Sequence, residues 1–171
     1  MKAKYIILII IIVVSCFLLY VVVGFGFLQS AFHISKAEKC ISTYRNSFEV
    51  SMRYIEDYTE EQRWTFWRLV KGKVLEQTYA GREEALIIDG KENIEAFDML
   101  SSAGVRSIEY NRDKGYFVFV FQSGLSKSKG VLYYTGDTDN LPFYDLPYET
   151  VSLKKIDGEY GWYYYTHETK D

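Results

Sequence analysis

Residues 116–121 read YFVFVF and decide the fold of this chain of 171 residues. Aromatic and β-branched side chains favour strands, and a run that is apolar at every position is typical of a strand covered on both faces. The stretch therefore predicts a central strand of a β-sheet.

In segments before and after this stretch, apolar and polar residues alternate with a period of two, as they do in a half-exposed strand. Residues typical of turns separate these segments. We expect turns at residues 111–115, Asn-Arg-Asp-Lys-Gly, and at Asp157-Gly158. Further strands are expected at 105–111, 130–134, 151–155 and 162–165. Connections this short predict an antiparallel meander of four or five strands.

Helical signals come before the strands. Residues 34–58 show apolar positions at helical spacing, and 91–103 form a shorter helix that ends at Gly104. Residues 59–62, Thr-Glu-Glu-Gln, fit a capping box and predict a helix from about residue 60 with Trp64 and Trp67 on one face. Helices followed by strands indicate an α+β domain over 34–171, mainly helical over 34–104 and an antiparallel sheet over 105–168.

Ile34, Ile41, Phe48 and Ile55 recur every seven residues in the helix predicted over 34–58. Such a stripe can form a coiled-coil homo-oligomer or pack on the protein's own sheet. The second stripe that a coiled coil needs would lie three residues further along, at Ala37, Tyr44, Ser51 and Tyr58. Serine and tyrosine fit such a stripe poorly, so we favour packing on the sheet.

Residues 5–28 form an apolar run, in which 21 of 24 positions are hydrophobic. A helix of this length spans roughly 36 Å, more than the roughly 30 Å hydrocarbon core of a bilayer. We therefore expect residues 1–33 to be a transmembrane anchor that contacts lipid through 5–28. Lys2 and Lys4 predict an N-terminus inside and a domain outside the cytoplasmic membrane.

A lipoprotein signal is a minor alternative for the same run. Residues 13–16, Val-Val-Ser-Cys, resemble a lipobox, which would make Cys16 a lipidated N-terminus. The apolar run continues beyond Cys16, which favours an uncleaved anchor.

Charge and motifs exclude several function classes. Residues 34–171 hold all 23 Asp and Glu but 18 of the Lys and Arg, a net charge of −5, which argues against nucleic-acid binding. The two His residues, His33 and His167, fit no metal-ligand spacing. Because no nucleophile motif or phosphate loop occurs either, we predict a non-enzymatic protein without cofactor or metal.

Aromatic residues are the unusual compositional feature, at 18% of the chain. Tyrosine and tryptophan dominate protein-binding hot spots and stack on sugar rings. Consecutive tyrosines in a strand point to opposite faces, so some must lie away from the helices. The candidate binding surface consists of Tyr134, Phe143, Tyr144, Tyr148 and Tyr164.

The layout resembles that of small bacterial membrane-anchored or lipoprotein-like proteins of unknown function. The resemblance rests on Ser123-Gly124-Leu125, on residues 130–134, Gly-Val-Leu-Tyr-Tyr, and on residues 162–165, Trp-Tyr-Tyr-Tyr. It implies a bacterial envelope protein and no particular activity.

Together these features predict a single-pass membrane protein that serves as a non-enzymatic binding or accessory module at the bacterial envelope, with a protein partner. An envelope enzyme or glycan-binding module is one alternative. A structural subunit of a membrane complex is the other.

Overall fold

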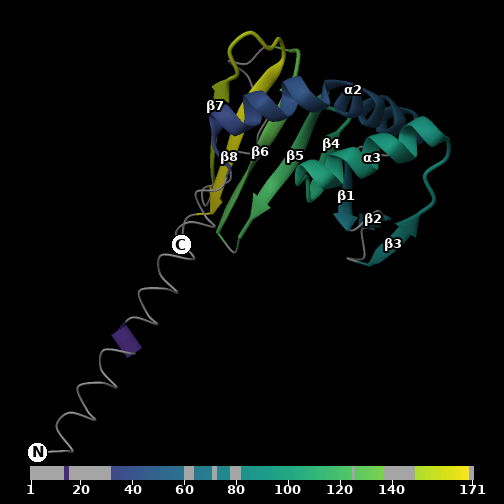
Figure 1. Cartoon of the computed structure of the whole chain (residues 1–171), viewed down its shortest axis with the longest axis horizontal. Helices are drawn as coiled ribbons and strands as arrows, with labels where there is room; N and C mark the ends of the chain where they lie inside the picture. The colour runs from purple at the N-terminus through teal and green to yellow at the C-terminus, as the bar shows by residue number, and fades with distance from the viewer. Residues whose placement is uncertain are drawn as a thin grey trace, which may run out of the picture. The chain divides into compact units, whose positions relative to one another are not determined.

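The computed structural model describes residues 14–15, 32–59, 64–70, 73–77, 82–124, 126–136 and 149–169. In this part of the chain one antiparallel sheet of eight strands forms a layer, and helices α2 and α3 cover one of its faces (Figure 1). The elements in chain order are α2 (Ile34–Tyr58), β1 (Trp64–Val70), β2 (Lys73–Gln77), β3 (Glu83–Leu86), α3 (Lys91–Ala103), β4 (Ser107–Asn111), β5 (Tyr116–Ser123), β6 (Lys127–Tyr134), β7 (Glu149–Lys155) and β8 (Trp162–Thr169).

The predicted central strand is confirmed as β5, in which residues 116–121 are all buried. Phe117, Phe119 and Phe121 pack toward the helices, where they belong to the main core. The alternate side chains form a second, smaller core on the other face with Leu132 and Tyr165. A run that is apolar at every position is therefore buried on both sides of the sheet.

Helix α2 confirms the prediction for 34–58, and its apolar stripe packs on the protein's own sheet. Phe48 lies at the centre, with ring centroids 4.7 Å from Phe119 and 5.1 Å from Trp162. Ile41 and Ile55 are fully buried in the same core. The alternative favoured from the sequence, an amphipathic helix lying on its sheet, is the one observed.

The predicted helix near residue 60 is wrong, because Trp64–Val70 is strand β1. Thr65, Trp67 and Leu69 are buried, and the residues between them are more exposed. Thr59 ends α2 instead of starting a helix, since its hydroxyl donates to the Ile55 carbonyl at 2.5 Å. Residues 60–62 lie outside the described part of the chain.

The prediction of a four- or five-stranded meander is also corrected. The sheet has eight strands in the order β3-β2-β1-β4-β5-β6-β8-β7, so β1–β3 lie within a region expected to be mainly helical. The last strand, β8, lies between β6 and β7. This order follows from burial, because β8 contributes buried Trp162 and Tyr165, whereas β7 places exposed Lys154 and Lys155 at the edge.

A further correction concerns the membrane. Within the described ranges, no helix has the length and apolar character needed to cross a bilayer. The described helices are surface helices, because each has a buried apolar face and exposed charged side chains such as Lys39 and Glu92. The predicted single-pass membrane protein, with a transmembrane helix and its N-terminus inside, is therefore not retained. The run 5–28 lies outside the described residues except for Val14 and Ser15.

Candidate functional site

The structure places the two described members of the predicted aromatic surface on opposite faces of the sheet. Tyr134 packs against the smaller core on the face away from the helices. Tyr164 packs against the main core, and its hydroxyl donates to the Phe32 carbonyl at 3.0 Å. Burial raises the pKa of Tyr164, as expected for a phenol with a structural role.

The other predicted residues, Phe143, Tyr144, Tyr148 and the alternative lipidation residue Cys16, lie outside the described residues. The described tyrosines do not meet because β6 and β8 pair in a register that sets Tyr164 opposite Val131. Val131 faces the helices, whereas Tyr134 is an odd number of residues along the same strand. Two aromatic residues in neighbouring strands therefore do not form one surface.

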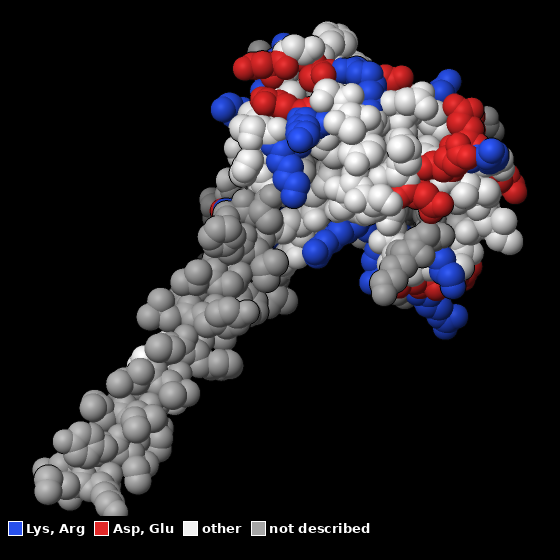
Figure 2. All heavy atoms as spheres, viewed as in Figure 1, with Lys and Arg blue, Asp and Glu red and all other residues white. Residues whose placement is uncertain are grey.

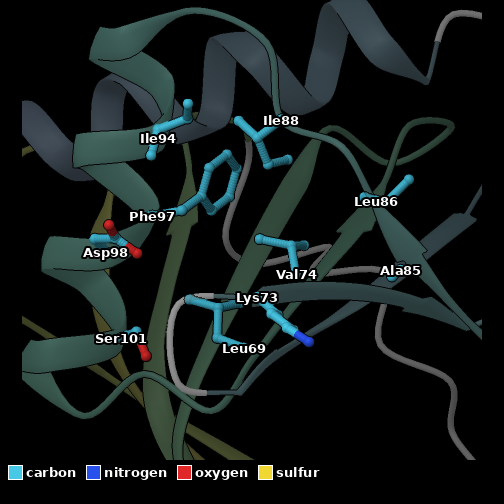
Figure 3. Close-up of a pocket in the computed structure, with 10 residues that line it drawn as sticks. All are labelled: Leu69, Lys73, Val74, Ala85, Leu86, Ile88, Ile94, Phe97, Asp98 and Ser101. Carbon is cyan, nitrogen blue, oxygen red and sulfur yellow. The ribbon is translucent and has the colours of Figure 1, made fainter.

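A pocket at the β3 end of the sheet is the clearest concave site in the described part of the chain. It lies between α3 and strands β1–β3, has a volume of about 330 Å³ and is partly open to solvent (Figure 3). Its lining is mainly apolar and comes from all of these elements and from the segment between β3 and α3: Leu69, Val74, Ala85, Leu86, Ile88, Ile94 and Phe97. We refer to this site as the α3–β3 pocket.

Polar groups enter this lining at only a few positions. Lys73 comes from β2, where its exposed side chain lies on the face opposite to buried Val74, and Asp98 and Ser101 come from α3, three residues apart (Figure 3). Apolar walls with a few placed polar groups are the usual composition of a binding pocket. The site can therefore accept an apolar group and orient it through the Asp98 carboxylate or the Ser101 hydroxyl.

The inner wall of the pocket is held rigidly by aromatic packing. Phe97 has ring centroids 5.7 Å from Trp67 and 5.8 Å from Tyr54. The Tyr54 hydroxyl also accepts a hydrogen bond from the Asp89 amide at 3.3 Å, which ties the segment after Ile88 to α2. Because these contacts hold both α3 and the β3–α3 segment, the pocket is pre-formed.

Apolar side chains remain exposed beside the pocket. Ile87 is 85% exposed, and Ile94 is 46% exposed. Ile94 lies on the rim of the pocket because α3 leaves a gap above β2 and β3 (Figure 3). Exposed isoleucines next to an apolar hollow are typical of an interaction surface.

Two titratable groups with raised pKa values lie elsewhere. Cys40 is in the main core, where burial raises the pKa of its thiol to about 11 despite the opposing influence of Lys36. Glu109 is on the opposite face of the sheet, and burial raises the pKa of its carboxyl to about 7. Among the described residues, no group of His, Cys, Asp and Glu could hold a metal ion.

The pocket could not be predicted from the sequence, because residues 73–90, which form much of its wall, show neither a clear helical nor a clear strand period. The one local signal is the pair Ile87-Ile88 directly before Asp89-Gly90. Two large apolar residues next to a turn are unusual, since turns lie on the surface. In comparisons with family models, curated proteins and solved structures, nothing matches this chain, so its function must be inferred from the site.

Proposed function

We propose that the domain is a non-enzymatic protein-binding module that accepts an apolar side chain of a partner in the α3–β3 pocket. The observation that supports this most directly is the pre-formed apolar hollow with exposed Ile94 at its rim. Protein interfaces are commonly centred on one large side chain that enters a desolvated pocket.

The expected energy of such a contact is moderate. Complete burial of one Leu, Ile or Phe side chain contributes about 1.5–3 kcal/mol, which corresponds to roughly a tenfold to hundredfold change in affinity. A pocket of about 330 Å³ can take one or two such side chains but cannot by itself give tight binding. We therefore expect contacts around the pocket to contribute as well.

The experiment that tests this proposal pans a random peptide library against the immobilised full-length chain. Recovered peptides are then measured against Ser101→Phe, which fills the pocket, and Ser102→Phe, which places the same ring at an exposed neighbouring position. We expect Ser101→Phe to lose about tenfold or more in affinity and Ser102→Phe to bind like the wild type.

A second matched pair tests the pocket even if the Ser101→Phe variant does not fold. Ile94→Ser removes an apolar side chain from the rim, and Met99→Ser removes one of similar exposure that does not line the pocket. If every recovered peptide binds the two members of each pair with equal affinity, the pocket is not a protein-binding site and the proposal is wrong.

A further inference from the structure

The outer edge of strand β3 lies next to the α3–β3 pocket, and this inference rests on the proposed function of that pocket. β3 is the first strand of the sheet, and among the described residues no strand pairs with its outer side. An edge strand presents unpaired backbone N–H and C=O groups to any extended segment that approaches it.

The pocket and this edge are close enough to be used together. Leu86 and Ala85 belong to β3 and also line the pocket (Figure 3). Alternate side chains of a strand point to the same face, so an added strand would direct every second side chain to the face on which Leu86 lies. An extended partner segment could thus pair with β3 and place an apolar side chain in the pocket.

Acidic residues are concentrated around the same site. Residues 82–101 include six Asp and Glu and two Lys and Arg, a net charge of −4, whereas the whole chain has a net charge of −3. Figure 2 shows acidic side chains at the end of the domain that carries α3, with basic side chains among them and near β2 and β3. The excess of carboxylates in residues 82–101 therefore favours a positively charged partner.

Only some of these carboxylates are neutralised by neighbouring cations. Arg68 pairs with Glu83 at 2.5 Å, and Lys91 pairs with Glu95 at 3.6 Å. In the described ranges, no ion pair involves Asp98 at the pocket or Glu84, which lies two residues before Leu86 on the same side of β3. Carboxylates next to a free strand edge can therefore bind the cations of a partner.

We propose that the partner segment is an extended basic peptide that adds a strand to the free edge of β3, places one apolar side chain in the α3–β3 pocket and sets Lys or Arg side chains against Glu84 and Asp98. Strand addition supplies affinity through backbone hydrogen bonds, and the pocket and carboxylates supply specificity. A second copy of this chain fits less well, because its own β3 edge would bring like charges together.

The experiment uses the peptides recovered from the random library on the full-length chain. We expect pocket-dependent peptides to be enriched in Lys and Arg that alternate with apolar residues. Asp98→Lys should weaken their binding about tenfold, whereas Asp157→Lys, an equal charge reversal in the turn between β7 and β8, should leave it unchanged.

Two further measurements report the strand pairing itself. Single N-methylation along a recovered peptide should weaken binding at every second amide, since only alternate N–H groups of an added strand face β3. Hydrogen exchange of the amides in Glu83–Leu86 should slow when the peptide is bound.

The outcomes separate this inference from the proposed function. Recovered peptides that depend on the pocket but are acidic or neutral, or that show no alternation on N-methylation, would overturn strand addition by a basic segment while the binding module stands. A lack of any pocket-dependent peptide would overturn the proposed function instead.

Discussion

Glu109 is expected to make the stability of the protein depend on pH. It is the middle residue of β4, and its cross-strand neighbours are Phe66 in β1 and Val118 in β5. The side chains of these two neighbours have no polar atom that could hydrogen-bond to a carboxylate. Arg68 lies on the same face but is engaged by Glu83. Burial without a compensating partner raises the pKa of the Glu109 carboxyl from 4.5 to about 7.

The sign of the effect follows from proton binding. Between pH 4.5 and about 7 the folded state binds this proton and the unfolded state does not. The contribution of Glu109 to stability is therefore fully present below pH 4.5 and is lost as the pH rises through about 7. The pKa difference corresponds to at most about 3 kcal/mol, and we expect about 1–3 kcal/mol because part of the residue stays accessible.

Glu109→Gln removes the ionisation and keeps the shape of the side chain. We expect the variant to be about 1–3 kcal/mol more stable than the wild type at about pH 8, with the gain disappearing below pH 4.5. The measurement is urea unfolding at a series of pH values, followed by tryptophan fluorescence. Glu92→Gln, at an exposed position of α3, is the control and should change stability little across the range. A gain in stability of Glu109→Gln that is the same at every pH would show that the pKa of Glu109 is not raised by folding.

Three further predictions concern the core. Phe48→Ala should cost about 3–5 kcal/mol in urea unfolding, because Phe48 is fully buried against Phe119 and Trp162. Gly130→Ala should prevent stable pairing of β5 with β6, because its Cβ would meet the Phe119 carbonyl; unchanged thermal stability would contradict this. Cys40 should resist alkylation in the folded protein and react only after denaturation, as checked by peptide mass spectrometry, since burial keeps its thiol protonated.

Local signals were sufficient where a segment carries a pattern or a turn residue that favours one structure strongly. Residues 116–121 are apolar at every position, and 91–103 end at Gly104, which has a positive φ of 98°. The turn residues Gly115 and Gly158 likewise have positive φ values of 66° and 75°. Glycine adopts this conformation without the steric cost that other residues incur, so these positions were predictable.

Trp64–Val70 shows where local signals fail. Trp64 and Trp67 are three residues apart, which fits a helix, while Thr65, Trp67 and Leu69 alternate as in a strand. Pairing with β4, in which Trp67 lies opposite Ile108, decides between these patterns, and this contact joins residues far apart in the chain. Sheet pairing depends on such neighbours more than on the preference of a residue alone.

The sequence by itself determined the long helix over 34–58, the short helix over 91–103, the doubly buried strand over 116–121 and the acidic character of residues 34–171. These are properties of local periodicity and composition, which do not require a partner element. Only the tertiary structure decided that β1–β3 extend the sheet and that α3 leaves an apolar pocket beside β3. Short strands and pockets exist only through contacts between distant segments, because a strand of a few residues has no stability until its neighbours pair with it.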